Sequence, residues 1–411
     1  MSYRVAGIDV HKKVLMVVVI DAAEPDLRPV RRRLGTLHSD LRELARWLKE
    51  QQVQEVVMES TAQYWRPVWL ELEEQFAALH LAQAFSNRAP RGKKHDFKDA
   101  ERLVRRKIAN ELILSFVPRG EQRRWRDLTR MKTHLTGDRV RVHNQIEALL
   151  EEMRIKLSSV ISDLFGLSGL RIMQALAAGA SDPQQLAQLA DRRLKCSQEQ
   201  LVDALTGSPH PTHCAMLGMH LERLERIEEQ IAKIGELLGE AMKSYADPVA
   251  RLAEVNGFGV DSAQQFIAEV GPEAATFASA AELVHWVGVC PGQNESAEKN
   301  QSSRSPKGNK YLRRLLNQLA HAAVKTKGSH LQAVFRRFLP KFGYKGAIWV
   351  VAHRLCELGW IILHRGVRFI EYGQIPNLKA RKQRAQSLVR ALRKLGYDVL
   401  LRPNNPAPAG V

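Results

Sequence analysis

Short apolar runs rich in β-branched residues predict a sheet in the first part of the chain. Three of them predict strands joined as a meander, at residues 3–10, 15–20 and 30–37. Shorter runs then alternate with segments of helical periodicity, which predicts strands at 56–58 and 80–82 and helices at 41–48, 70–76 and from Asp96 onward. Ser39 and Asp40 form a helix-capping pattern before the first of these helices.

Beyond Pro118, apolar residues recur over much longer segments. Two stripes repeat every seven residues: Leu128, Leu135, Val142 and Leu149, then Leu217, Leu224, Ile231 and Leu238. Such a repeat is typical either of a core helix or of a coiled-coil seam. We expect an elongated helical arm that makes or bridges subunits, with its first helix interrupted at Gly137 and Asp138 and with a small helical insertion at 181–206.

From Asp247 onward, shorter helices are expected, at 249–255 and 261–270, with a tight turn at Gly257 and Gly259 between them. Two helices about such a turn form either an ordinary helical corner or a helix-hairpin-helix-like element, whose helix start offers N–H groups to a DNA phosphate. The sequence predicts a polar, basic loop at residues 286–314 and a buried helix at 347–363. A basic helix after Pro376 and a disordered end at 403–411 complete the chain.

These changes of pattern divide the 411 residues into four segments. The first, 1–118, has the strand and helix order of a ribonuclease H-like mixed sheet, an α/β arrangement. The rest is all-α: an arm with its insertion at 119–246, a helical domain at 247–375 and a basic tail at 376–411.

The charge of the chain narrows the choice of partner. A total of 62 Lys and Arg against 44 Asp and Glu gives a net charge of +18, which attracts polyanions and exceeds what solubility requires. Since no apolar run is long enough to span a bilayer, we expect nucleic acid rather than a membrane. The tail, whose only acid is Asp398, is either a solvated face or a further nucleic-acid contact.

Cysteine usage predicts a reduced, cytoplasmic protein. The four cysteines are scattered, and the chain shows no secretory leader. His210, His213 and Cys214 lie close together, but their spacing matches no standard zinc pattern.

Four carboxylates are candidates for chemistry. Asp9 and Glu59 end two predicted strands, and Asp96 and Asp99, three residues apart, project from one face of a helix start. Taken singly, these acids are turn or helix-capping residues. Brought together they would repel one another strongly, and a divalent metal resolves this repulsion. Mg²⁺, or Mn²⁺, takes such oxygen ligands together with phosphate oxygens, which points to chemistry at a phosphodiester.

Motifs around these acids carry a family resemblance. They are GIDVHK at 7–12, MEST at 58–61 with Tyr64 and Trp65, and KHDFKDA at 94–100. VNGFG at 255–259, WVGVCP at 286–291, Glu295 with Ser296, and KGN at 307–309 with Leu312 and Arg313 follow in order. Over nearly its whole length the chain resembles the transposases of insertion sequence family 110. These are bridge-RNA-guided recombinases that pair a RuvC-like DEDD domain with a carboxyl-terminal serine domain.

The resemblance implies a DNA recombinase in which Ser296 forms a phosphoserine link and Asp9, Glu59, Asp96 and Asp99 bind the metal. Ala297 stands where the family usually has glycine, and Ser302, Ser303 and Ser305 lie nearby. The implied partners are donor and target DNA, a structured bridge RNA, and further copies of the chain as a dimer assembling to a tetramer, with a composite site built across subunits. Expected nucleic-acid contacts are Lys12, Lys93, Lys94, Gly257, Gly259, Lys307, Asn309 and Arg313.

Two other functions remain open from the residues alone. One is a RuvC-like junction or nucleic-acid endonuclease, in which metal-bound water attacks and Ser296 only caps or packs. The other is a non-catalytic nucleic-acid-binding assembly protein, in which the acids only cap helices. Guidance by RNA rests on the resemblance alone, because neither periodicity nor composition indicates it.

Overall fold

The computed structural model describes residues 3–24, 29–60, 62–84, 87, 96–291, 295–296, 299–300, 305–371 and 378–400. At Asp96, in 295–296 and 299–300 and in 378–384 it describes the backbone alone. The chain forms two compact units, residues 1–119 and 120–411. The finer division of the second unit at 246 and 375 stays a prediction.

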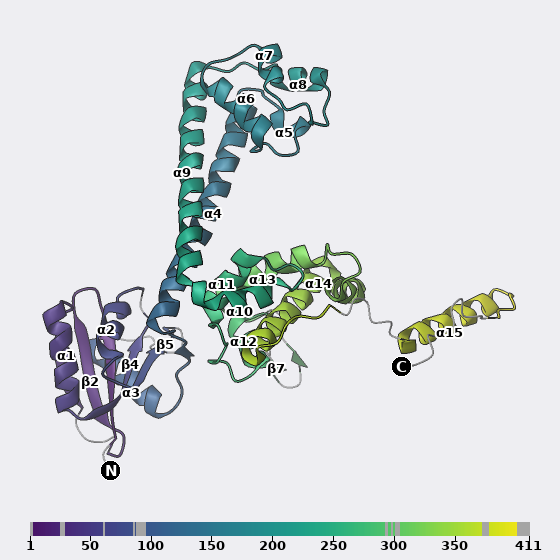
Figure 1. Ribbon diagram of the computed structural model, residues 1–411. Helices are drawn as coiled ribbons and strands as arrows, with labels where there is room; N and C mark the ends of the chain where they lie inside the picture. Colours follow the sequence, from purple (N-terminus) through teal and green to yellow (C-terminus); the bar gives the residue numbers. More distant parts are fainter. Residues whose placement is uncertain are drawn as a thin grey trace. The chain divides into compact units, whose positions relative to one another are not determined.

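A mixed sheet forms the core of the first unit (Figure 1). Within the described residues it has six strands: β1 Arg4–Val10, β2 Leu15–Asp21, β3 Val30–Leu34, β4 Val53–Glu59, β5 Ala78–Ala82 and β6 Leu114–Ser115. Their order is β3-β2-β1-β4-β5-β6. The β1–β4 and β4–β5 pairs are parallel and the other pairs antiparallel. This confirms the predicted ribonuclease H-like sheet, to which the unpredicted β6 adds an edge.

Alternation along the strands sends their side chains to two different layers of helices. Ala6, Ile8 and Val10 of β1 share one cluster with Leu44 of α1 (His38–Glu50) and Leu72 of α2 (Trp65–Leu72). On the opposite face, Val5, Val18 and Ile20 pack against Ala100 and Val104, two residues of α3 (Asp96–Ile108). The central strands are therefore buried on both sides.

Three predicted boundaries in this unit are wrong. The third strand ends at Leu34 rather than at residue 37, and the second helix covers Trp65–Leu72 rather than 70–76. The first helix begins at His38, so Ser39 and Asp40 lie inside it. Asp40 still serves the helix start, because its carboxylate accepts a hydrogen bond from the Leu37 N–H at 3.0 Å.

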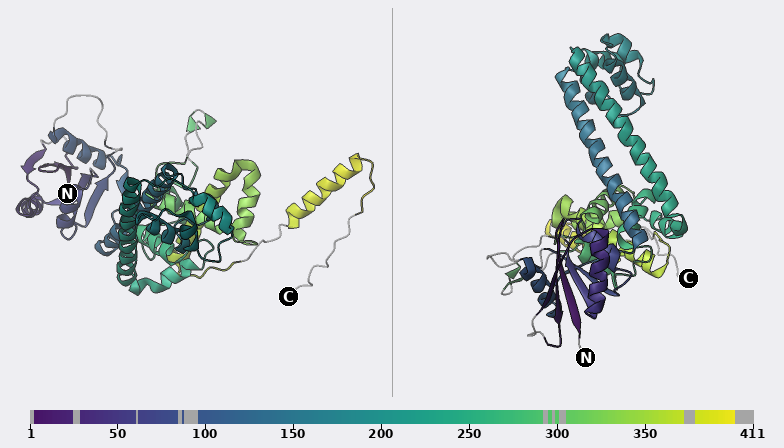
Figure 2. Two further views of the ribbon diagram at one scale, coloured as in Figure 1. Left: turned by 90° about the horizontal axis from the view of Figure 1, so that it is seen from above. Right: turned by 90° about the vertical axis from the view of Figure 1, so that its left-hand side faces the viewer.

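Two long helices form an arm in the second unit. They are α4 (Gly120–Glu152) and α9 (Pro211–Ala241), which run side by side in opposite directions (Figures 1 and 2). Val142 and Ile146 of α4 share one buried cluster with Leu217, Leu224 and Ile234 of α9. The two heptad stripes are thus filled by each other within one chain, and the expectation that the arm makes or bridges subunits stays a prediction.

The arm also differs from prediction in its continuity. Helix α4 runs through Gly137 and Asp138 without interruption. Pro211 lies in the first turn of α9, where the missing N–H of proline costs no helical hydrogen bond. At the far end of the arm lie α5 (Leu157–Val160), α6 (Leu167–Ala177), α7 (Pro183–Gln188) and α8 (Gln198–Leu205). The last two confirm the predicted helical insertion.

Further helices, most of them short, pack at the other end of the arm. They are η1 (Lys243–Tyr245), α10 (Ala246–Ala253), α11 (Val260–Val270), α12 (Ala280–Val287), α13 (Lys310–Ala323) and α14 (His330–Arg365). A small hairpin of β7 (Glu295–Ser296) and β8 (Lys299–Asn300) lies between α12 and α13, and α15 (Leu378–Lys394) follows α14. The predicted loop at 286–314 is therefore wrong at both ends, because Trp286 belongs to α12 and residues from Lys310 onward to α13.

Helix α14 corrects the expectation that no apolar run could span a bilayer. Among the described helices it alone is long and apolar enough to do so. Ala347, Val351 and Leu355 are nevertheless fully buried inside the unit, so its apolar character is that of a core helix. The helix bends at Gly343, whose φ of 67° is left-handed. The predicted disorder at 403–411 falls outside the described residues.

The filled seam makes the arm sensitive to truncation of its inner side chains. Replacing Ile146, which is 0 % exposed, by alanine should lower the free energy of unfolding by about 2–5 kcal/mol. Met131→Ala removes a side chain that is 52 % exposed on the same helix and should change it by no more than about 0.5 kcal/mol. Urea unfolding compares the two, and equal losses would mean that the seam is not packed as described.

Candidate active site

Two of the four candidate carboxylates lie at the carboxyl ends of neighbouring strands, at the same edge of the sheet. Asp9 is near the carboxyl end of β1, and Glu59 is the last residue of β4. These strands are parallel neighbours with Ile8 opposite Met58, so Asp9 and Glu59 come one position further along each strand. The same topology that builds the sheet therefore places the two acids side by side.

Both acids also face the same helix. Asp9 shares its side of β1 with Val5, which packs against α3. Glu59 shares its side of β4 with Val57, which packs against Leu103 of α3. Asp99 lies on α3 next to Ala100, so all three carboxylates belong to the α3 side of the sheet.

A glycine allows α3 to approach β1 closely. A Cβ at Gly7 would lie 2.5 Å from the Ala100 carbonyl oxygen and 2.6 Å from Cγ2 of Val104. Any larger residue would push α3, and Asp99 with it, away from Asp9. Farther along the helix, Lys107 holds α3 to the sheet, because its Nζ lies 2.6 Å from the Glu55 carboxylate of β4.

The carboxylates of Asp9, Glu59 and Asp99 interact electrostatically. Burial raises the pKa of Asp9 above its ordinary value, and the carboxylates of Asp99 and Glu59 raise it further. His11 acts in the opposite direction and lowers the pKa, since its Nε2 lies 3.1 Å from Oδ2 of Asp9. The ionised form of Asp9 is therefore disfavoured unless a further positive charge is present.

Three residues that the sequence analysis missed contact these acids. They are His11, Arg102, whose Nη2 lies 2.5 Å from Oδ1 of Asp99, and Asn87, whose Nδ2 donates to Oε2 of Glu59 at 2.7 Å. Asn87 is only 3 % exposed, and its Oδ1 has no hydrogen-bond partner. His11 follows the first strand directly and could have been noticed. Asn87 lies in a stretch without periodicity, so only the fold reveals it.

The donor set fits a divalent cation in its chemistry. In the described residues no three Asp, Glu, His or Cys side chains are already grouped as ligands, and the side chain of Asp96 is outside the description. Oxygen donors from carboxylates are nevertheless what Mg²⁺ and Mn²⁺ take. A hydrated cation would relieve the repulsion at Asp9, and its water could bond the buried Oδ1 of Asn87, which has no partner among the described residues.

A basic cleft runs along α3 beside the acids. It has a volume of about 580 Å³, and its basic lining residues are Arg31, Lys98, Arg102, Arg105 and Arg106. Two acids, Glu101 and Glu111, also line it. Five basic residues against these two leave the cleft with an excess of positive charge, which attracts polyanions.

The second unit holds the predicted serine on its small hairpin. Ser296 of β7 pairs with Lys299 of β8. Its side chain is not described, and Lys93 and Lys94 lie outside the described residues altogether. Lys12 and Lys307 are exposed, as a nucleic-acid contact requires. All of these assignments stay predictions.

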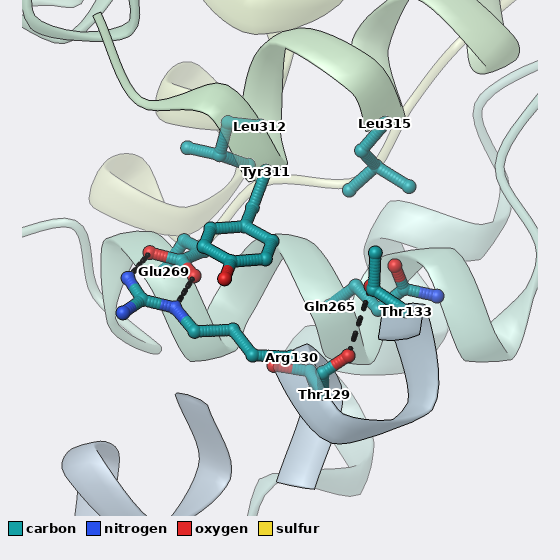
Figure 3. Close-up of a pocket in the computed structure, with 8 residues that line it drawn as sticks. All are labelled: Thr129, Arg130, Thr133, Gln265, Glu269, Tyr311, Leu312 and Leu315. Atoms are coloured by element: carbon teal, nitrogen blue, oxygen red, sulfur yellow. Dashed lines mark hydrogen bonds and ion pairs between the residues drawn. The ribbon is translucent and has the colours of Figure 1, made fainter. Parts of the chain in front are cut away.

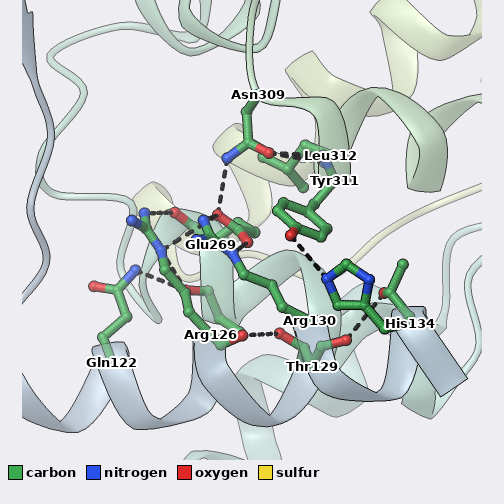
Figure 4. A network of polar contacts seen from close by, with 11 residues as sticks. Gln122, Arg126, Thr129, Arg130, His134, Glu269, Asn309, Tyr311 and Leu312 are labelled. Carbon is green, nitrogen blue, oxygen red and sulfur yellow. Dashed lines mark hydrogen bonds and ion pairs between the residues drawn. The ribbon is translucent and has the colours of Figure 1, made fainter. Parts of the chain in front are cut away.

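Asn309 and Arg313 make contacts within the protein, and their predicted contacts with nucleic acid stay predictions. Asn309 caps α13, because its Oδ1 accepts from the N–H groups of Tyr311 and Leu312 at 3.0 and 3.1 Å. Its Nδ2 donates to Glu269 at 2.8 Å (Figure 4). Arg313 donates to the carbonyl oxygens of Gly288 and Pro306.

The turn between α10 and α11 has a structural role in the described fold. Gly257 has a φ of 100°, and a Cβ there would lie 2.6 Å from the Leu319 carbonyl oxygen of α13. Close packing of two helices thus requires this glycine. Gly259 is exposed and precedes α11 with open space around it. A phosphate contact at this turn stays a prediction, and the ordinary helical corner explains Gly257.

Comparison with known proteins agrees with this fold. Residues 6–155 match a family model described as a transposase and labelled for the DEDD domain of IS110 elements. Fold and acids together define the class, a DEDD transposase with a ribonuclease H-like domain. Residues 249–336 match a second model, described as the transposase IS116/IS110/IS902 family.

A curated relative gives the same result. A Pseudomonas aeruginosa protein named a probable family 20 transposase is 25% identical over 329 residues, which cover 78% of this chain and 83% of the relative. The chain belongs to the IS110/IS116/IS902 family of transposases. It is an enzyme of transposition, and as a transposase it binds DNA.

The close approach at Gly7 can be tested by adding one methyl group. Gly7→Ala should lower the free energy of unfolding by about 1–3 kcal/mol, because the new Cβ overlaps α3 backbone. Gly239→Ala is the control, since nothing lies within 4 Å of that site on helix α9. It should stabilise by up to about 1 kcal/mol. Thermal unfolding gives both values, and an unaffected Gly7→Ala protein would contradict the packing.

Repulsion at the acidic edge predicts that removing one charge stabilises the protein. Asp9→Asn should raise the unfolding temperature at pH 7 without metal, whereas Glu74→Gln, at an exposed carboxylate, should not. The pKa of Asp9 is raised on folding, so protonation favours the folded state, and the advantage of Asp9→Asn should shrink as pH falls through that raised pKa.

Adding Mg²⁺ should reverse the order of the unfolding temperatures of wild type and Asp9→Asn. Mg²⁺ at 100 times its dissociation constant stabilises a protein that binds it by about 2.7 kcal/mol. The wild-type unfolding temperature should therefore rise on adding Mg²⁺, while that of Asp9→Asn should rise much less. Equal responses of the two proteins would argue against a metal at these acids.

Proposed function

We propose that this transposase cuts and rejoins DNA through a covalent phosphoserine link at Ser296, supported by a divalent metal at Asp9, Glu59, Asp96 and Asp99. The observation that carries the metal-dependent chemistry is the convergence of Asp9, Glu59 and Asp99 on the α3 side of one sheet edge. Ser296 is supported by its place on a hairpin inside the region that matches the transposase model.

In the proposed step the Ser296 hydroxyl oxygen forms a bond to the scissile phosphorus. The bond from phosphorus to the leaving deoxyribose oxygen breaks, and that oxygen gains a proton while the serine hydroxyl loses one. No bond energy is lost to water, so the strand can be passed to a new deoxyribose hydroxyl by the reverse reaction. Rejoining therefore needs no separate energy source.

The carboxylates would hold Mg²⁺ or Mn²⁺. When bound, the ion supplies stabilisation of the negative charge that develops on the phosphate oxygens. Asn87 keeps Glu59 in place through its 2.7 Å hydrogen bond, and Arg102 balances Asp99. The lysines and arginines along α3 would hold the nucleic-acid backbone beside these acids.

We further propose that a structured RNA selects the DNA targets. The net charge of +18 supports binding of a polyanion, but contacts to phosphates carry no sequence information by themselves. Base pairing with an RNA would provide that information. Assembly as a dimer that forms a tetramer is part of the same proposal and rests on the family resemblance.

A trapping assay tests the serine. Purified protein, element-derived RNA and a nicked target duplex are incubated with Mg²⁺, and protein–DNA adducts that survive denaturation are counted. Wild type should give an adduct, Ser296→Ala none, and Asp9→Ala at least about 100-fold less, because charge stabilisation is lost. Omitting the RNA should abolish target-specific adducts. Ser303→Ala, at a neighbouring serine, is the matched control and should behave as wild type.

Other outcomes are equally clear. Metal-dependent cleavage without any adduct would replace the proposal by a nuclease that uses water. An adduct that persists in Ser296→Ala but disappears in Ser303→Ala would move the nucleophile to Ser303. Adducts independent of RNA would remove the guide from the proposal.

A further inference from the structure

The two ends of the segment that carries the serine hairpin meet at Gly288 and Gly308. A Cβ at Gly308 would lie 2.2 Å from the Val287 carbonyl oxygen, and one at Gly288 would lie 2.6 Å from the Pro306 carbonyl oxygen. Gly288 also needs its left-handed φ of 76°, which ends α12. Backbone therefore packs directly on backbone where the segment leaves α12 and returns to α13.

Arg313 joins both ends through one side chain. Its Nη1 donates to the Gly288 carbonyl oxygen and, at 3.1 Å, to the Pro306 carbonyl oxygen. The guanidinium lies over the Trp349 ring, 4.8 Å from its centroid, so α14 supports its orientation. Nη1 of Arg313 is thus committed to two carbonyl oxygens of the protein and is not available to a phosphate.

The returning end is tied to a buried charge centre (Figures 3 and 4). Asn309 donates to Glu269, whose side chain is 3 % exposed. Arg130 binds the same carboxylate through two nitrogens, at 2.8 and 3.0 Å, and Arg126 lies 3.3 Å from it. The start of α13 is thereby fixed to α11 and to the foot of α4.

The departing end has a weaker tie of its own. Nδ1 of His353 on α14 lies 3.3 Å from the Val289 carbonyl oxygen. Both ends of the segment are thus bonded to helices of the same unit, whereas Ser296 lies on the hairpin between them. Ser296 is joined to both ends by the chain itself, so anchoring these ends limits where the hairpin can lie.

We propose that Arg313 is a positioning residue for Ser296, rather than a nucleic-acid contact. Arg313 holds Gly288 and Pro306 together, where the segment that carries Ser296 begins and ends, and so fixes the position of the Ser296 hydroxyl when DNA is bound. The proposal rests on the nucleophilic role of Ser296. Misplacing a reacting group by about 1 Å costs on the order of 100-fold in rate, and this is the effect expected when the closure is lost.

The test separates binding from reaction. Arg313→Ala is compared with Arg314→Ala, which removes the same charge from the next, exposed residue. Two quantities are measured on the full chain with RNA: the dissociation constant for nicked duplex, and the rate of adduct formation at saturating DNA. Arg313→Ala should react about 100-fold more slowly while its dissociation constant stays within about threefold of wild type. Arg314→Ala should react at the wild-type rate.

A second variant disturbs the contact between the two ends of the segment without removing a charge. Gly308→Ala leaves every charge in place but sets a methyl group against the Val287 carbonyl oxygen, so it should also slow the reaction at unchanged affinity. Thermal unfolding of each variant is recorded beside the kinetics, and the rate comparison is made below the lowest unfolding temperature.

Three results would overturn the proposal, and they differ from one another. Weaker DNA binding by Arg313→Ala, with an unchanged rate at saturation, would make Arg313 a nucleic-acid contact. A wild-type rate and affinity for both Arg313→Ala and Gly308→Ala would show that the closure is irrelevant to reaction. Absence of an adduct in the wild type would remove the role of Ser296, and the positioning proposal with it.

Discussion

Repulsion among carboxylates at one edge of the sheet is the constraint on which the first unit depends. Asp9, Glu59 and Asp99 gain nothing from one another, and burial makes the ionised form of Asp9 costlier still. The unit must supply that free energy elsewhere. It does so through a sheet whose central strands are buried on both faces and through the close contact of α3 with β1 at Gly7.

The second unit handles buried charge in the opposite way. The Glu269 side chain is only 3 % exposed, yet Arg126, Arg130 and the amide of Asn309 bond its carboxylate. A buried group of this kind adds little net stability, but removing one partner is costly, so it specifies a single arrangement of helices. Repulsion at the acidic edge would be relieved by an added cation, whereas the charge of Glu269 is balanced within the protein.

These two ways of handling buried charge suit two different roles. Carboxylates that repel one another favour an added cation, so such a cluster suits metal-dependent chemistry. Polar and charged groups that are bonded within the protein suit a place where a segment must be held still. The bonds of Arg313 and Asn309 to the protein are of the second kind, although an arginine and an asparagine at a helix start after a polar stretch are equally typical of a nucleic-acid contact.

Prediction from the sequence succeeded where a signal is local and periodic. Strand alternation and seven-residue repeats led to the right elements in the sheet and the arm. It failed where packing overrides local preference. Gly137 does not break α4, because the neighbouring helix α9 stabilises the seam.

The sequence by itself determined the ribonuclease H-like fold, the family and the spacing of the candidate acids, because these are written in periodicity and in short motifs. Only the tertiary structure decided that the two heptad stripes fill each other. The same is true of Asn87 reaching Glu59 and of Arg313 turning inward to two carbonyl oxygens. Apart from the bond between Arg313 and Pro306, these contacts join residues far apart along the chain, and a side chain's partner at such a distance depends on the packed fold.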